Sequence, residues 1–293
     1  MAALRYSSIL LFAAGVALAQ NPPAADEQTA VIAATREGAL RFSDKLPDFI
    51  CTQVTRRWVG SNQAPTTMIF GGRRMAREPE TIRTNEDFQW KLKDTLTIQL
   101  TYFGQKEQYK LLLVNGAQAK QSYESVDGTT SYGDFGSLLG IVFQDSAQAA
   151  FKWDHWGVLN GETVMVYGFE VAAAHSQWRI GYGTQEIITG IKGFVFIEPK
   201  SKQVLKLEVN AADIPKKFPI QRSGVELDYR MQSVGVTEYL LPLKAVNWSD
   251  AKNVRTKNEL EFRKYRKFSA DSKLDFDTPA PLPERQVKEA EPK

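Results

Sequence analysis

The sequence predicts an α+β fold: a large curled antiparallel sheet, a half-open β-barrel of about ten to eleven strands, wrapped around two helices. Apolar and polar residues alternate through most of the chain, as in TLTIQLTYF at 95–103, where a strand would have one apolar and one polar face. Only two stretches show the apolar spacing of a helix. A sheet this wide with one apolar face must curl, and amphipathic helices can fill its concave side.

Residues 1–19 predict a signal peptide. A single charge, Arg5, precedes an apolar stretch at 9–16, and Ala17-Leu18-Ala19 has the small-x-small pattern of a cleavage site. The apolar stretch is shorter than the roughly 20 residues of a membrane-spanning helix, so cleavage is favoured over an uncleaved anchor. The mature chain is expected to begin at Gln20 without a lipid anchor, because no cysteine stands there, and to be periplasmic or secreted.

Two helices are expected after a flexible N-terminus at 20–25. Apolar residues recur at helical spacing in both, Pro47 follows the first, and Ser137 can cap the second. The helices are expected over residues 26–45 and 137–150.

The strands are expected between turn and loop signals. Gly104 and Asn115-Gly116 mark turns, Gly71-Gly72 indicates a bend or bulge, and the polar stretch 117–135 is expected to be a loop. The strands are expected over residues 49–59, 66–74, 88–92, 95–103, 108–114, 151–158, 162–173, 176–181, 191–198, 203–212, 223–233, 236–248 and 256–268.

Residues 26–276 are expected to form one domain, because no internal repeat and no linker divides them. From Asp277 onward the chain is Pro-rich and charged, ending in KEAEPK. Such a composition cannot bury a core, so 277–293 are expected to be a disordered tail.

The composition argues against a nucleic-acid binder, because such proteins normally carry a strong basic excess. The formal net charge is +3, from 37 Lys and Arg against 34 Asp and Glu, and removal of Arg5 with the leader leaves 36 against 34, or +2. Basic clusters are expected to be solvated surface that could contact an anionic membrane. They lie at residues 56–57, 73–74, 216–217 and 263–267.

The residues for catalysis or metal binding are few, and no metal or cofactor is expected. Cys51 is the only cysteine, so no intramolecular disulfide can form, and we expect it to be buried and inert. His155 and His175 are the only histidines and lack ligand spacing. Neighbouring residues on a strand point to opposite faces, so Asp154 and His155 are not expected to form a dyad. No nucleophile elbow, metalloprotease, phosphate-loop or dinucleotide motif is present, so a non-enzymatic protein is expected.

Long aliphatic and aromatic residues recur along the predicted strands. A packed core of sheet on helix accounts for part of them. A half-barrel whose concave face is only partly filled by two helices would also leave an apolar groove, and such a groove suits an acyl chain.

Several stretches resemble the LolA/LolB lipoprotein-carrier superfamily. GFVFIEPKSKQVLKLEVNAAD at 193–213 is similar to its hairpin, in which a strand ends in an acidic residue and Pro, and a Lys-rich turn leads to an alternating strand. VELDYRMQSVGVTEYLLPLKAV at 225–246 resembles the next hairpin, and ELEFRKYRKF at 259–268 the strand that closes the sheet. LPDFICTQVTRR at 46–57 resembles the start of a set of secreted bacterial proteins. The resemblance implies an eleven-stranded open barrel with helices on its concave side, which relatives use to carry lipoprotein acyl chains, to hold glycolipids or to sense misplaced lipoproteins.

The leading hypothesis is a monomeric periplasmic protein that binds a lipid or an acylated protein in a concave apolar groove, with Leu139 and Phe143 as its lid. The alternative is an envelope sensor or scaffold that binds a protein partner. A hydrolase that uses a carboxylate with His155 or His175 is less favoured. The candidate groove residues are Leu96, Ile98, Leu100, Leu139, Phe143, Phe194, Phe196, Leu205, Leu207, Leu227, Tyr229 and Phe262.

Overall fold

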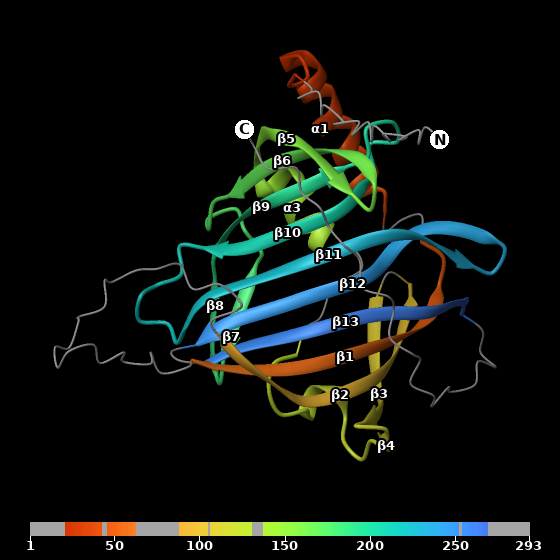
Figure 1. The fold of residues 1–293 in the computed structure, drawn as a ribbon, viewed down its shortest axis with the longest axis vertical. Coiled ribbons are helices and arrows are strands. Elements are labelled where there is room, and N and C mark those ends of the chain that lie inside the picture. Colours follow the sequence, from red (N-terminus) through yellow and green to blue (C-terminus); the bar gives the residue numbers. More distant parts are fainter. Residues whose placement is uncertain are drawn as a thin grey trace, which may run out of the picture.

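The structure, a computed structural model, describes residues 21–42, 46–62, 88–104, 106–130, 137–251 and 254–268. Within these residues, eleven strands form one antiparallel sheet and two more form a separate hairpin (Figure 1). The elements are α1 (Ala25–Leu40), β1 (Phe49–Asn62), β2 (Phe88–Phe103), β3 (Lys106–Val114), β4 (Ala117–Gln118), α3 (Ser137–Phe143), β5 (Ala150–Leu159), β6 (Glu162–Val171), β7 (Arg179–Tyr182), β8 (Gln185–Ile188), β9 (Gly190–Ile197), β10 (Val204–Ala212), β11 (Ile220–Val234), β12 (Thr237–Ala251) and β13 (Val254–Lys267).

The strand order shows that the sheet does not close. It runs β4-β3-β2-β1-β13-β12-β11-β10-β9-β6-β5, so β4 and β5 remain as two separate edges. Most neighbours in the sheet are consecutive in the chain and make simple hairpins. The long-range pairing of β1 with β13 joins the first strands to the last ones. The predicted α+β half-open barrel with two helices is confirmed.

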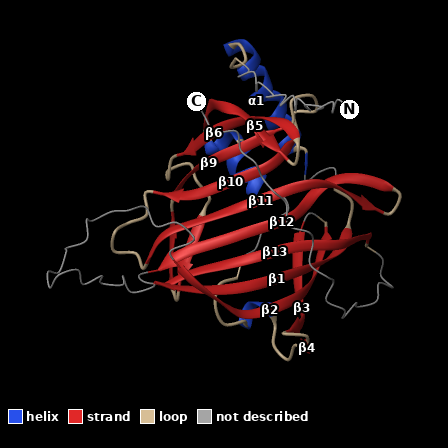
Figure 2. Ribbon diagram, viewed as in Figure 1, coloured by secondary structure: helices blue, strands red, loops and turns tan. Residues whose placement is uncertain are grey.

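Register places apolar residues of neighbouring strands on one face. Val195, Leu207, Leu227 and Ala245 are paired in turn across β9, β10, β11 and β12. Paired residues point to the same side of a sheet. All four are buried, and they pack in one cluster with residues of both helices. This face is therefore the concave side. In the view of Figure 2, α3 lies behind β6, β9 and β10, and α1 extends beyond the β5 edge of the sheet.

The two helices form because their buried residues follow helical spacing. In α1, Val31, Thr35 and Ala39 recur every four residues and are buried. The second helix ends at Phe143 instead of the predicted 150. A short 3₁₀ turn at Asp145–Ala147 follows it, Gln148 has a left-handed φ of 48°, and β5 already starts at Ala150.

Several strands differ from the predicted ones: β1, β11 and β12 extend up to three residues past the predicted bounds, and four larger differences follow. The predicted strands 88–92 and 95–103 are one strand, β2, and the strand predicted at 176–181 begins only at Arg179. The strand β8 was not predicted. The predicted loop 117–135 contains β4 and a 3₁₀ turn at Tyr123–Ser125. The predicted signal peptide, the strand at 66–74 and the tail at 277–293 lie outside the described residues.

Candidate ligand groove

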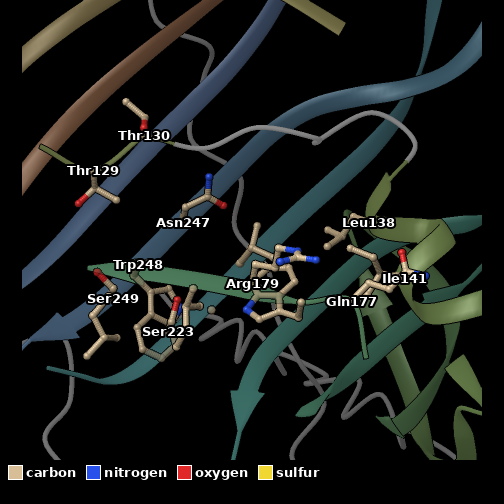
Figure 3. Close-up of a pocket in the computed structure, with 16 residues that line it drawn as sticks. Thr129, Thr130, Leu138, Ile141, Gln177, Arg179, Ser223, Asn247, Trp248 and Ser249 are labelled. Atoms are coloured by element: carbon tan, nitrogen blue, oxygen red, sulfur yellow. The ribbon is translucent and has the colours of Figure 1, made fainter. Parts of the chain in front are cut away.

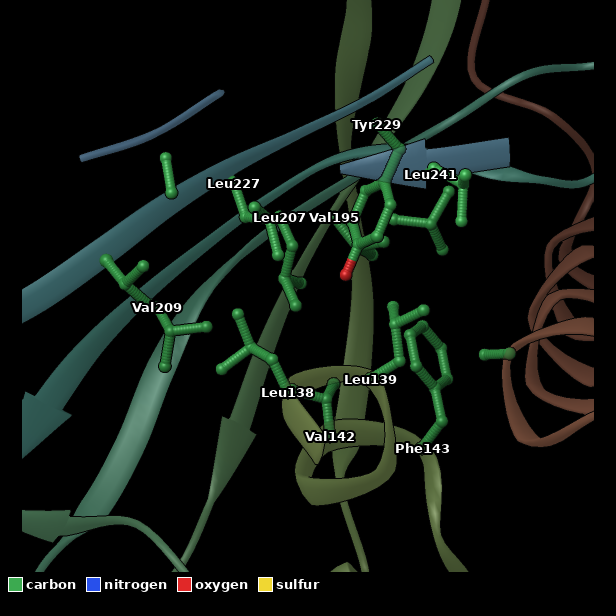
Figure 4. Close-up of a cluster of buried hydrophobic side chains, with 14 of the residues drawn as sticks. Leu138, Leu139, Val142, Phe143, Val195, Leu207, Val209, Leu227, Tyr229 and Leu241 are labelled. Atoms are coloured by element: carbon green, nitrogen blue, oxygen red, sulfur yellow. The ribbon is translucent and has the colours of Figure 1, made fainter. Parts of the chain in front are cut away.

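The α3 helix fills one part of the concave side. Its Leu138, Leu139, Val142 and Phe143 point at the apolar face of β9, β10, β11 and β12 (Figure 4). Seven of the candidate groove residues belong to this cluster and are at most 3% exposed, so here they form packed core. They are Leu100, Leu139, Phe143, Leu207, Leu227, Tyr229 and Phe262.

The loop after β4 fills a second part of the concave side. Leu96 and Ile98 of β2 are fully buried against Tyr123 and Val126, two residues of this loop. The loop is attached to the sheet, because the Asn258 side chain donates a hydrogen bond to the Thr129 carbonyl at 2.9 Å. The burial of Tyr123 and Val126 was not predicted, because residues 117–135 are polar in composition.

Three candidate residues lie on the convex side. Phe196 pairs with Lys206 and Phe194 with Glu208, one residue away from the inward pair Val195 and Leu207. Phe194 is 38% exposed. Phe196 and Leu205 pack in a separate outer cluster whose other buried members are Leu159, Val164 and Val166.

A groove of about 500 Å³ remains between the two filled parts (Figure 3). Thr129 and Thr130 of the loop line one side, and Leu138 and Ile141 of α3 line another. Its volume lies within the roughly 300–1,000 Å³ of small-molecule sites. None of the twelve candidate residues is part of this lining. The remaining lining residues come from the β7 region and from β11 and β12: Gln177, Trp178, Arg179, Ile180, Gly181, Ile220, Ser223, Gly224, Val225, Asn247, Trp248 and Ser249.

The β7–β8 hairpin brings Trp178 to the groove. The backbone N–H of Trp178 donates to Ser176 Oγ at 3.1 Å, and its carbonyl accepts from Thr189 N–H at 3.1 Å. Trp178 packs against a small apolar cluster formed by Ile180, Phe218 and Ile220. Alternation in the strand predicted at 176–181 was a signal for this wall, but nothing in the sequence showed that it faces β11 and β12.

Two polar groups of the lining have no hydrogen-bond partner within the described chain. They are Trp178 Nε1 and Asn247 Nδ2, and both atoms are buried. Both are hydrogen-bond donors. Arg179 also lines the groove, and its Nη1 lies 2.7 Å from Glu186 Oε1 in an exposed ion pair. Among the described lining residues there is no carboxylate. The groove therefore has apolar walls and one cation, Arg179, whereas the two buried donor atoms have almost no accessible surface.

The expectation that Asp154 and His155 do not meet is wrong. Asp154 Oδ2 lies 2.5 Å from His155 Nδ1. A β-bulge between Trp153 and His155 in the pairing of β5 with β6 breaks the alternation that would have separated them. His175 is exposed in the turn after β6. No group of three or more candidate metal-ligating side chains occurs in the described part of the chain.

Burial makes the Cys51 thiol a poor nucleophile. The side chain is 1% exposed, and burial, reinforced by the negative charge of Glu107, raises the pKa of the thiol well above its ordinary value. The thiolate is the reactive form of cysteine, so the sulfur is unreactive in the folded protein.

The basic clusters are only partly solvated. Arg57 and Arg263 are buried instead of lying on the surface, because each has a carboxylate partner, Asp94 and Glu261 respectively. In the cluster at 263–267, Lys264 and Lys267 are exposed. The cluster at 216–217 is exposed, and that at 73–74 lies outside the described residues.

Solved structures with low sequence identity align with most of this chain. A candidate outer membrane lipoprotein-sorting protein domain from Vibrio parahaemolyticus is 12% identical over 86% of this chain and 97% of its own, with a TM-score of 0.32. A DUF1329 family protein from Desulfovibrio piger is 9% identical over 82% and 95%, with a TM-score of 0.34. A LolA superfamily protein from Nitrosomonas europaea is 10% identical over 82% and 93%, with a TM-score of 0.28.

No protein-family model and no curated protein matches the chain. No helix in the described residues has the length and apolar character needed to span a membrane. The TM-scores are too low for a function to be transferred, so the function proposed below rests on the residues of this chain.

Proposed function

We propose that this protein is a non-enzymatic binder of a lipid or a lipidated protein in the bacterial envelope, and that it holds an acyl chain in the concave groove. The observation that carries the proposal is the groove of about 500 Å³ that α3 lines together with Thr129 and Thr130 of the loop after β4. Its apolar walls include Leu138, Ile141 and Val225. An acyl chain matches such walls because burial of apolar surface is its main source of affinity.

The size of the groove suits part of a fatty chain. At about 0.8 kcal/mol per buried CH₂, eight methylenes contribute roughly 6 kcal/mol before the costs of binding are subtracted. The residues of the packed core support the groove without lining it. Leu139 and Phe143 are not lining residues; they pack in the cluster with the sheet and hold α3 in place (Figure 4).

The test fills the groove with one side chain. Ile141→Trp adds an indole to the wall formed by α3, and Val158→Trp adds the same group at an exposed position of β5 as the matched control. Wild type and the control are expected to bind lipid from a bacterial envelope extract in native mass spectrometry, and Ile141→Trp is expected to lose most of this binding. Equal binding by all three folded proteins would contradict the groove as the site.

A further inference from the structure

We infer that one end of the groove, lined by the hydroxyl residues Thr129, Thr130, Ser223 and Ser249, is the subsite for the head of the bound amphiphile. The head that fits this end carries ester and hydroxyl oxygen atoms, as a glycerol ester does, and the methyl end of the acyl chain points at α3. This inference rests on the proposed function and gives the ligand a direction in the same groove.

The hydroxyl groups form a row across three strands and the loop. Ser223, Ser249 and Thr256 are paired in turn across β11, β12 and β13. Ser249 Oγ lies 2.9 Å from Thr256 Oγ1, and Thr129 Oγ1 donates to the same atom at 3.1 Å. The row therefore runs from the sheet to the loop that lines the groove.

The same face of the sheet becomes apolar toward α3. Val225 and Asn247 form the next pair along β11 and β12, and the buried Leu227 and Ala245 form the pair after that. Val225, Leu227 and Ala245 pack with Leu138 of α3 in the concave cluster. Pairs on one face are about 6.6 Å apart along a strand, so the sheet changes from hydroxyl-bearing to apolar over roughly 13 Å.

The close-up of the groove shows the same separation of its two ends. Thr129 and Thr130 lie on one side of the view in Figure 3, and Leu138 and Ile141 lie on the other. An amphiphile has the matching distribution of polar and apolar groups along its length.

The lining hydroxyl residues can be reached by a ligand. Thr129, Thr130, Ser223 and Ser249 are all half-buried, and all four line the groove. A hydroxyl group has one hydrogen to donate and two lone pairs that accept, so Thr129 and Ser249 retain further capacity beside their bonds to Thr256. They can therefore bond to the oxygen atoms and hydroxyl groups of a head.

The reverse orientation would be unfavourable at both ends. Ester and hydroxyl oxygens would leave water for contact with apolar side chains such as Leu138 and Val225. The acyl chain would also displace water from the hydroxyl residues without replacing its hydrogen bonds. Charge plays no part in this assignment, because Arg179 is already paired with Glu186.

The experiment locates the two ends of one ligand. The probe is 1-decanoylglycerol, below its micelle concentration, bound to residues 20–293 with ¹³C-labelled methyl groups. In an isotope-filtered nuclear Overhauser spectrum, the terminal methyl of the ligand is expected to contact the methyl groups of Leu138 and Ile141. The glycerol protons are expected to contact the methyl group of Thr130.

A double variant tests whether the hydroxyl groups bind the head. Thr130→Val with Ser249→Ala is expected to weaken the binding of 1-decanoylglycerol by about tenfold, as measured by calorimetry. Binding of 1-decanol, which lacks the ester and glycerol oxygens, is expected to change less. The matched control is Thr163→Val with Ser233→Ala, which removes the same groups at exposed positions of β6 and β11 and is expected to leave both affinities unchanged.

The outcomes separate this inference from the proposed function. Reversed contacts, or contacts of both ligand ends with both groove ends, would overturn the orientation while the acyl-chain groove stands. Unchanged binding of 1-decanoylglycerol in the double variant, or an equal loss for 1-decanol, would overturn the role of the hydroxyl groups. No binding of 1-decanoylglycerol to the wild-type protein would overturn this inference and the proposed function together.

Discussion

Arg57 and Asp94 form a two-pronged ion pair inside the protein: Nε lies 2.6 Å from Oδ1, and Nη2 lies 2.6 Å from Oδ2. They are directly paired across β1 and β2, and Arg57 is only 3% exposed. The loop after β4 lies next to the pair, since a Cβ on Gly128 would sit 3.3 Å from Arg57 Nη1. Lys93 reaches the same loop and donates to the Asp127 carbonyl at 2.8 Å. The pair thus joins β1 to β2 beside the loop that forms one boundary of the groove, and Lys93 makes the hydrogen bond to that loop.

Breaking this pair should be costly. Asp94→Ala leaves the Arg57 charge buried without its partner, and we expect it to lower the free energy of unfolding by about 3–5 kcal/mol. The double variant Arg57→Met with Asp94→Leu removes both charges and should cost much less. Urea denaturation of the three proteins measures both values, and a loss below about 1 kcal/mol for Asp94→Ala would show that the pair does not stabilise the fold.

Gly193 is expected to be indispensable for the pairing of β9 with β10. A Cβ at this position would overlap the backbone carbonyl oxygen of Glu208, which cannot move without breaking the sheet. Gly193→Ala should therefore prevent folding or lower the free energy of unfolding by several kcal/mol, about as much as overpacking a core.

The matched control for this substitution is Gly38→Ala in α1. Gly38 is exposed, and a Cβ there meets nothing within 4 Å. Alanine is the better helix former, so this change should raise stability by about 0.5–1 kcal/mol. Thermal unfolding followed by circular dichroism measures whether each variant is less or more stable than wild type. A similar change in stability for the two variants would contradict the close approach of β9 and β10.

Cys51 should make stability fall at alkaline pH. Burial raises the pKa of the Cys51 thiol in the folded protein above its value in the unfolded chain. The contribution of the buried thiol to the free energy of unfolding is therefore complete below the unfolded pKa. It is lost as the pH rises toward the folded pKa. Above about pH 8.5, the difference in unfolding free energy between wild type and Cys51→Ala should decrease by about 1.4 kcal/mol per pH unit.

Alkylation provides a direct check on the same thiol. Iodoacetamide at pH 9 is expected to leave Cys51 unmodified in the native protein and to modify it fully in urea. Rapid modification of the native protein would mean that the sulfur is accessible, contrary to its burial within the concave cluster.

The fold was predictable because the alternation of apolar and polar residues in the long strands fixes which face of each strand is buried. Leu96, Ile98 and Leu100 alternate with threonine and glutamine, and a shift by one residue would expose all three. The pattern fails where both faces are apolar. Phe194 and Phe196 are as hydrophobic as Val195, so only the pairing with β10 shows that Val195 points inward.

The groove itself was not predictable, because it depends on elements without a strong pattern. The β8 strand is four residues long, QEII, and only its pairing with β7 defines it. The end of α3 at Phe143 is set by the 3₁₀ turn and by β5, which compete with a helical pattern that continues to Ala150. The contact between Asp154 and His155 needs a bulge that no residue in the sequence marks.

The α3 helix should be necessary for the fold as well as for the groove. Phe143→Ala removes a fully buried ring that stacks on Phe151 at 5.3 Å between centroids, and we expect a loss of about 3–5 kcal/mol. Phe103→Ala removes a ring that is 50% exposed and should cost much less. Equal losses in chemical denaturation would show that α3 does not pack in the concavity as described.

Native mass spectrometry of the mature protein, residues 20–293, isolated from a periplasm without added lipid, tests the central claim most directly. The proposed function predicts a reproducible bound mass that organic extraction releases as an acyl-chain lipid, and that Ile141→Trp lacks. A clean apoprotein mass that stays unchanged when envelope lipids are added would contradict the acyl-chain groove. Binding of a protein partner at the sheet would then become the leading explanation.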